Sequence, residues 1–164
     1  RGQLGHNSGP REEYSPRLVA ALRRKGANRV VCGDDHNIVL CDNGGLYVFG
    51  GNSAGQLGLG DLNDVGLPRP LLLAGEGDMD AEPGATSPII DIAAGGRGSL
   101  FLNGAGQVFM CGDGGERRHS ARRTPRRVAV LPVPQGISSL SMSNSRAYAV
   151  SDAGQIYSWT SFDA

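Results

Sequence analysis

Short apolar segments alternate with glycine-rich turns along the chain, and these segments recur in one order. The clearest unit is residues 45–58, where an apolar segment with aromatic side chains leads into a Gly-Gln-Leu-Gly turn. The apolar segment recurs at residues 106–112 and 154–159, and the turn recurs at residues 2–5. Strands and tight turns repeated in this way predict an array of one β unit.

Each repeat contains, in order, the Gly-Gln-Leu-Gly turn, a strand led by proline, a hairpin of small residues and the aromatic strand. We expect the proline-led strands at residues 15–19, 67–71 and 124–128, and the hairpins at residues 31–40, 93–102 and 141–150. We align the aromatic strands on Gly45, Gly106 and Gly154. The resulting spacings, on the order of 50 residues, are typical of propeller blades or similar arrays.

Residues 15–26 carry a local signal that conflicts with this order. Ser15 followed by Pro16 is a typical helix start, and Gly26 is a typical helix stop. The corresponding segment of the next repeat contains Pro68 and Pro70, which the interior of a helix would not accept. We therefore expect a short strand over residues 17–19 and a helical turn over residues 20–25.

Composition and charge narrow the class of protein. The chain has 26 glycines in 164 residues, about twice the usual share of roughly 7%, which indicates many tight turns. Lys and Arg number 16, as do Asp and Glu, so any basic face for nucleic acid must be local. No apolar run approaches the roughly 18 residues of a membrane span. We expect a soluble, intracellular protein without membrane association.

The cysteines do not predict a metal site or a disulfide. Cys32, Cys41 and Cys111 lack the spacing of metal ligands. If Cys32 and Cys41 lie on the two arms of one hairpin, they are too far out of register for a disulfide. We expect all three to be small buried hydrophobic residues, and we expect no metal and no cofactor.

Charged residues collect in two stretches between the repeats. Residues 74–87 form an acidic insertion, which we expect to be a solvated loop. The second stretch is rich in arginine and stands where a Gly-Gln-Leu-Gly turn is due; its arginines are Arg117, Arg118, Arg122, Arg123, Arg126 and Arg127. Guanidinium groups bind phosphate or carboxylate bidentately. Nucleic-acid phosphate, an acidic protein surface and plain solvation are all compatible with this run.

The repeat resembles that of the regulator of chromosome condensation family. The residues that carry the resemblance are Tyr47, Phe49, Gly50, Asn52, Gly55 to Gly58, Gly60, Pro68, Cys32, Gly33 and His36. The resemblance implies an all-β fold, a β-propeller of four-stranded blades. About three blades would fill residues 1–164 as one domain, with final strands at about 45–50, 106–111 and 154–159. Further blades or another chain would then be needed to close the propeller.

The resemblance also implies a range of functions. Members of the family exchange guanine nucleotide on a small nuclear GTPase, bind histones and chromatin, or act as interaction scaffolds, in the nucleus or cytoplasm. We expect a non-enzymatic module for protein–protein interaction within a larger assembly. Two alternatives are a guanine-nucleotide exchange factor for a small GTPase, and a phosphate binder of chromatin or a ribonucleoprotein that uses the arginine run.

Two sequence features are assigned to structure rather than chemistry. Gly50, Gly55 and Gly58 recur where a turn needs a tight or positive-φ backbone, so we expect them to be structural turns. Ser53 lies in a Gly-x-Ser-x-Gly pattern, but the following Gln-Leu-Gly-Leu-Gly cannot be the helix that a nucleophile elbow requires. We therefore predict no catalytic residue.

Overall fold

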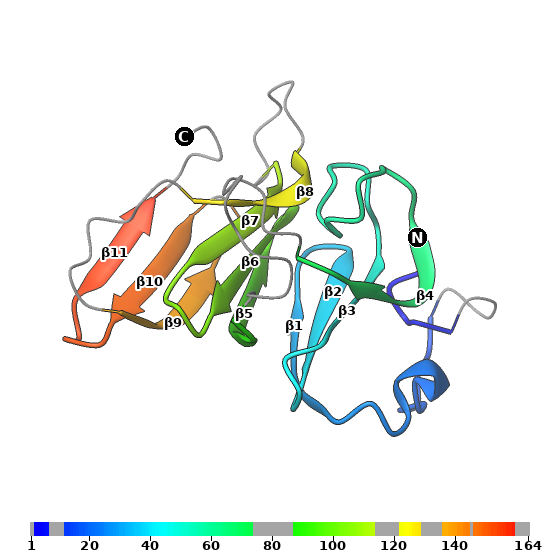
Figure 1. Ribbon diagram of the computed structural model, residues 1–164. Coiled ribbons are helices and arrows are strands. Elements are labelled where there is room, and N and C mark those ends of the chain that lie inside the picture. The colour runs from blue at the N-terminus through cyan, green and yellow to red at the C-terminus, as the bar shows by residue number, and fades with distance from the viewer. Residues whose placement is uncertain are drawn as a thin grey trace.

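The chain is an all-β, unclosed partial propeller in the computed structural model, which describes residues 2–6, 12–73, 87–113, 122–128, 136–144 and 146–159 (Figure 1). The described strands form three antiparallel sheets placed side by side, here called blades 1, 2 and 3. Blade 1 contains β1 (Ala27–Cys32), β2 (His36–Cys41), β3 (Leu46–Gly50) and β4 (Val65–Leu71). Blade 2 contains β5 (Ile89–Gly95), β6 (Gly98–Asn103), β7 (Val108–Gly112) and β8 (Arg122–Arg127). Blade 3 contains β9 (Ile137–Met142), β10 (Ala147–Ser151) and β11 (Ile156–Trp159). This arrangement confirms the predicted fold class.

Each complete blade takes its strands from two successive sequence repeats. The small-residue hairpin supplies the first two strands and the aromatic segment supplies the third. The fourth strand is the proline-led segment of the next repeat, which pairs antiparallel with the third strand, Val48 opposite Arg69 and Met110 opposite Arg126. Because this strand lies at the outer edge, its prolines interrupt no further ladder. The boundaries of the sequence repeat therefore do not coincide with the boundaries of the blade.

The structure corrects the alignment of the repeats by one residue. Gly44, and not Gly45, is equivalent to Gly106 and Gly154, because these three have φ of 77°, 75° and 76°. Each donates its N–H to the carbonyl three residues earlier, in a turn of the same form. An L-residue is strained at that φ, so this turn position requires glycine. The adjacent glycines at 44 and 45 made the choice ambiguous in the sequence.

The segment before blade 1 also differs from its prediction. Residues 17–19 are not a strand, because no third strand lies beside them among the described residues. The helical turn expected over residues 20–25 is shorter, a 3-10 helix η1 at Ala20–Leu22. A proline-led segment thus forms a strand only where a third strand is present to pair with it.

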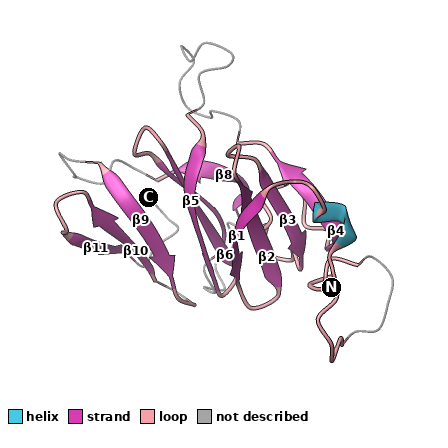
Figure 2. Cartoon of the chain, turned by 90° about the horizontal axis from the view of Figure 1, so that it is seen from below, coloured by secondary structure: helices cyan, strands magenta, loops and turns pink. Residues whose placement is uncertain are grey.

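The core lies between the blades, whose strands Figure 2 shows from below. Side chains on a strand alternate between its two faces, so blade 2 can pack against both neighbours. Phe101 and Phe109 of blade 2 join a cluster with blade 1, whereas Leu100 and Met110 join a cluster with blade 3. The first strands β1, β5 and β9 carry most contacts between blades. Each seam between blades is therefore a separate small hydrophobic core.

Candidate functional site

The turn after β3 holds the first candidate site, because its polar side chains are buried. Asn52 accepts a hydrogen bond from the Leu57 N–H at 2.9 Å and donates to the Asp61 carbonyl at 3.0 Å. Gln56 donates from Nε2 to Asp35 Oδ1 at 2.9 Å. Each side chain thus replaces water with partners in the protein, Asn52 inside the turn and Gln56 on the turn before β2, as buried amides must. The turn is therefore a rigid insert and not a loose loop.

This insert reaches across the seam between blades 1 and 2. The Gln56 carbonyl accepts hydrogen bonds from Ser99 Oγ at 2.7 Å and from Cys111 Sγ at 3.4 Å, both on blade 2. Ser99 Oγ also lies 2.9 Å from His36 Nε2 on blade 1. A chain of buried polar groups therefore links the two blades.

The direction of these bonds fixes the protonation of His36. Ser99 has one hydroxyl proton, which goes to the Gln56 carbonyl, so His36 must donate from Nε2 and carry no proton on Nδ1. Burial lowers the pKa of His36 to about 4, against an opposing effect of the nearby Asp35 carboxylate. The pair resembles a nucleophile and its base, yet both side chains are buried and the serine proton points away from the imidazole. The arrangement holds blades together and offers no reacting atom to a substrate.

Of the three predicted turn glycines, Gly50 directly precedes this insert, and Gly55 and Gly58 lie within it. Gly50, Gly55 and Gly58 have φ of 112°, 77° and 69°, the region that favours glycine. A Cβ on Gly50 would lie 2.4 Å from the Asp35 carbonyl oxygen, and one on Gly58 would lie 2.9 Å from Pro125. Their assignment as structural turns stays a prediction.

A second turn of the same sequence docks on the other side of blade 1. The Gln3 carbonyl accepts a hydrogen bond from Asn37 Nδ2 at 2.9 Å. A Cβ on Gly5 would lie 3.1 Å from the Phe49 ring. Asn37 and Phe49 face each other across β2 and β3, as Ser99 and Cys111 do across β6 and β7. The turn at residues 2–5 therefore sits on blade 1 as residues 55–58 sit on blade 2.

Asp91 joins the first strands of all three blades, and the sequence analysis missed it. Its buried carboxylate pairs with Arg29 of β1 and accepts the Leu140 N–H of β9 at 2.7 Å. It also accepts the N–H of Ile92 at 2.8 Å. A charged residue inside the apolar run Ile-Ile-Asp-Ile was the available signal, because a buried charge requires partners.

Four of the six predicted arginines lie together on β8. This strand is the outer edge of blade 2 and is drawn in yellow in Figure 1. Arg123 is exposed, and its carbonyl accepts the Gly60 N–H of the inserted turn at 2.8 Å. For Arg122, Arg126 and Arg127 the structure describes the backbone, whereas Arg117 and Arg118 lie outside the described residues. We call residues 122–127 the arginine edge.

The remaining candidates divide between the core and the surface. Cys41 and Cys111 are buried free thiols as predicted, and burial raises the pKa of Cys111 to about 12. Cys32 is exposed, so its predicted burial is wrong; no described segment covers that face of β1. In the described part of the chain, no group of His, Cys, Asp and Glu could hold a metal ion. The described helical residues include no helix that could cross a membrane.

Sequence comparison identifies the repeat. Residues 1–40 and 43–102 match the family model described as regulator of chromosome condensation (RCC1) repeat, and residues 28–56 match a second model of this repeat. Mouse protein RCC2 is 29% identical over 187 residues, which cover 97% of this chain and 34% of that protein. The chain thus spans about a third of the length of this relative.

Solved structures share the fold. The crystal structure of human WBSCR16 matches with a TM-score of 0.76 and 24% identity, over 97% of this chain and 40% of that one. The structure of Prp20p from Saccharomyces cerevisiae, described with its binding to Gsp1p and histones, has a TM-score of 0.62 and 24% identity. That match covers 82% of this chain and 33% of Prp20p. At such identities the likeness shows the fold alone.

Proposed function

Because the chain belongs to the regulator of chromosome condensation repeat family, we propose that it is a non-enzymatic β-propeller module that binds a protein partner inside the cell. The polar side chains buried in its seams are already engaged in holding the blades together. Recognition therefore belongs to the exposed strands and loops, where binding residues usually lie. The proposed contact is the arginine edge, and the proposed partner surface is acidic.

One observation carries this proposal: the arginine edge has more charge than the fold requires. Register places Arg126 opposite Met110 as Arg69 is placed opposite Val48, so this arginine belongs to the repeat. By the same register, three other positions of β8 are equivalent to uncharged positions of β4. Arg122, Arg123 and Arg127 stand in blade 2 where blade 1 has Val65, Gly66 and Pro70. Since blade 1 folds without these charges, we assign them to binding. Guanidinium groups pair bidentately with carboxylates, which makes an acidic surface the fitting partner.

A charge-reversal experiment tests the proposal. Proteins captured by the wild-type chain are quantified against those captured by the double variant Arg123→Glu with Arg127→Glu, after nuclease treatment. Arg69→Glu is the matched control, because it reverses one charge at the same edge of blade 1. We expect the double variant to lose an acidic partner that the control retains. That partner, purified, should bind the wild-type chain directly; equal capture by all three proteins would refute the proposal.

The phosphate alternative rests on the same arginines and makes a different prediction. A nucleic-acid binder loses affinity linearly in log–log form as salt rises, with a slope near −0.9 per phosphate contact on duplex DNA. Titration of labelled duplex DNA and structured RNA over a range of salt concentrations measures this slope. If phosphate is the ligand, the double variant binds more weakly. The slope of its log affinity against log salt should also be less steep, by the amount that about two phosphate contacts contribute. Weak binding with equal slopes for both proteins would exclude this alternative.

Nucleotide exchange is the third proposal; it comes from the family, and one protein that shares the fold, Prp20p, is described with its binding to Gsp1p. An exchange factor accelerates release of bound nucleotide from a small GTPase. The test is the release rate of a fluorescent guanine nucleotide from a panel of small GTPases with and without the chain. A rate that rises with the concentration of the chain would favour exchange over scaffolding, and unchanged rates would count against it.

A further inference from the structure

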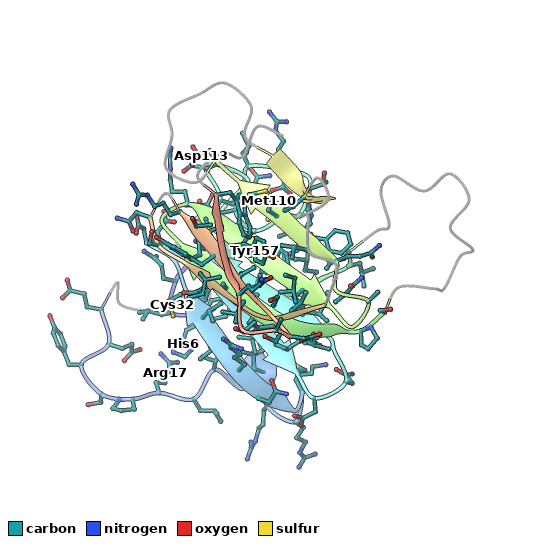
Figure 3. All side chains as sticks on the ribbon, turned by 90° about the vertical axis from the view of Figure 1, so that its left-hand side faces the viewer. His6, Arg17, Cys32, Met110, Asp113 and Tyr157 are labelled. Atoms are coloured by element: carbon teal, nitrogen blue, oxygen red, sulfur yellow. The ribbon has the colours of Figure 1, made fainter. Side chains whose placement is uncertain are left out.

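The middle of the arginine edge is not paired with the strand beside it. β8 pairs with β7 at Arg126, opposite Met110, and the next pair is Arg122, opposite Gly112. Between these two pairs β7 has a single residue, whereas β8 has three, residues 123–125, which we call the bulge of β8. In Figure 3, β8 is drawn in yellow and Met110 is labelled. A bulge leaves its extra residues without partners in the ladder and redirects their side chains. Contacts with another part of the molecule must therefore fix this bulge.

The inserted turn of blade 1 supplies these contacts. The Gly60 N–H donates a hydrogen bond of 2.8 Å to the Arg123 carbonyl. The atom nearest to a Cβ built on Gly60 would be Thr124 Cγ2, at 3.9 Å. Pro125 packs against Gly58, where a Cβ would lie 2.9 Å from the proline ring. Each residue of the bulge therefore lies beside the inserted turn, although the turn comes from the neighbouring blade.

Blade 1 indicates that this contact belongs to the repeat. Its fourth strand has a bulge at the equivalent place, because the register of β3 with β4 shifts between Val48 and Gly50. The turn at residues 2–5 lies against that bulge, since a Cβ on Gly2 would lie 2.6 Å from the Gly66 Cα. A docked turn thus accompanies the bulge of the fourth strand in both four-stranded blades. In blade 2 the same arrangement holds a strand that carries four arginines.

We propose that the inserted turn of blade 1 positions the arginine edge of blade 2 for its acidic partner, with Gly60 as the positioning residue. The inference rests on the proposed function for the chemistry of the ligand, and it adds that the site requires both blades. The partner binds the conformation in which the turn is docked, so by linkage the bound partner stabilises the docked turn. Binding at the arginine edge is therefore coupled to closure of the seam between blades 1 and 2.

Gly60 can be tested through backbone strain without a steric clash. Its φ is 87°, and a Cβ there would make an ordinary contact with Thr124. Gly60→Ala should therefore strain the turn and weaken the bond to Arg123, whereas Gly60→Asn should largely keep that bond, because asparagine tolerates positive φ better. Gly154→Ala is the matched control. Gly154 has φ of 76° and no atom within 4 Å of a Cβ built on it, and it lies on the β10–β11 turn of blade 3.

Amide hydrogen exchange in the chain without ligand tests the positioning by itself. In Gly60→Ala, the amide of residue 60 and the amides of Arg123 and Thr124 should exchange at least about fivefold faster than in the wild type, because strain at residue 60 favours local opening. In Gly60→Asn and Gly154→Ala these rates should stay within about twofold of the wild type. Equal exchange of the β8 amides in Gly60→Ala and Gly154→Ala would overturn the positioning role, whatever the partner is.

Binding of poly-L-glutamate, used as an acidic polypeptide probe, tests the consequence for recognition. Below the melting temperature of every variant, Gly60→Ala should raise the dissociation constant at least about threefold, since only molecules with the turn in place bind fully. Gly60→Asn and Gly154→Ala should stay within about twofold of the wild type.

Two results of this titration would overturn the proposal. Unchanged affinity in Gly60→Ala would mean that the arginine edge binds without the turn, and equal losses in both variants of Gly60 would mean that this residue contacts the ligand directly. Failure of the proposed function has a different signature. In that case the wild-type chain and the double variant Arg123→Glu with Arg127→Glu would bind poly-L-glutamate equally, while the exchange rates would still decide whether the turn positions β8.

Discussion

The two seams of this molecule each pack one blade against the next, but different groups hold them together. Between blades 1 and 2, the turn at residues 51–60 is inserted and the Gln56 carbonyl is bound by Ser99 and Cys111. Between blades 2 and 3, the positions of Ser99 and Cys111 hold Ala147 and Trp159. Ala147 has no side-chain donor for a turn carbonyl. The repeat that lost the Gly-Gln-Leu-Gly sequence has therefore also lost the hydroxyl that binds the turn carbonyl in blade 2.

This difference shows what the inserted turn contributes. The second seam relies on an apolar cluster and on the Asp91 carboxylate, which accepts the Leu140 N–H. The first seam has an apolar cluster, the Arg29–Asp91 pair and the buried polar insert. A buried hydrogen-bond network adds directional contacts to non-directional apolar packing. The first seam should therefore be more sensitive to single substitutions in the turn, and the following predictions rank that sensitivity.

The largest effect is expected from Leu57→Ala, at the buried leucine of the inserted turn. Removing this side chain leaves a cavity in the seam, which should lower the free energy of unfolding by about 3 kcal/mol. Leu4→Ala is the matched control, because Leu4 occupies the same place in the turn at residues 2–5 but is 36% exposed. Its cost should be below about 1 kcal/mol. Urea denaturation of both variants measures the difference, and equal losses would mean that the insert adds nothing specific.

Features of these seams could be predicted from the sequence when they depend on neighbouring residues, and not when they depend on residues far apart in the sequence. Turn glycines and alternating apolar residues are local signals, so the repeat, the blades and the turn positions could be predicted. The proline-led strand pairs with the blade that precedes it, and this pairing depends on strands distant in the sequence. The offset between the sequence repeat and the blade could therefore not be predicted. The exposure of Cys32 depends on a neighbouring blade, and the partners of Asp91 lie on β1 and β9. Such contacts leave only indirect traces in one sequence.

The next effect is a pH dependence confined to the first seam. The equivalents of His36 are Gly98 and Arg146, so the other blades have no histidine at this position. Since its pKa falls from 6.5 to about 4 on folding, the unfolded chain binds more protons between these values. Stability is therefore fully present above pH 6.5 and decreases as the pH falls toward 4, by about 2 kcal/mol between pH 6.5 and 5. Thermal or urea unfolding across this range measures the slope.

His36→Gln is the control for this dependence. Glutamine can donate a hydrogen bond toward Ser99 but does not titrate, so the variant should lose the slope while keeping a folded seam. A slope of the same size in the variant would assign the acid sensitivity to other groups.

A smaller effect is expected at the turn glycine Gly55, whose φ is 77°. Gly55→Val forces a β-branched residue into the left-handed region and should lower the free energy of unfolding by about 1 to 2 kcal/mol. Gly55→Asn should cost less, because asparagine tolerates this region better than other residues do. A valine variant with unchanged melting but altered partner binding would show that Gly55 serves recognition instead of the turn.

An effect of the same size is expected at Ser99, where the comparison of the seams is most direct. Ser99→Ala copies Ala147 of blade 3 and leaves the Gln56 carbonyl with the weak Cys111 thiol as its remaining side-chain donor. It also removes the acceptor of the His36 Nε2–H. Losing a buried hydrogen bond costs about 1 kcal/mol net, and more when a partner is left unsatisfied. We therefore expect a loss of about 1 to 2 kcal/mol.

Asn37→Ala provides the matched control for Ser99, because Asn37 makes the equivalent bond to the Gln3 carbonyl from a half-buried position. Water can replace that bond, so the loss should be below about 1 kcal/mol. The double variant Ser99→Ala with His36→Gln should lose less than the sum of the two single variants, since both act on one hydrogen-bond chain. Strict additivity would mean that the imidazole and the hydroxyl stabilise the seam independently, and that the first seam differs from the second by separate contacts.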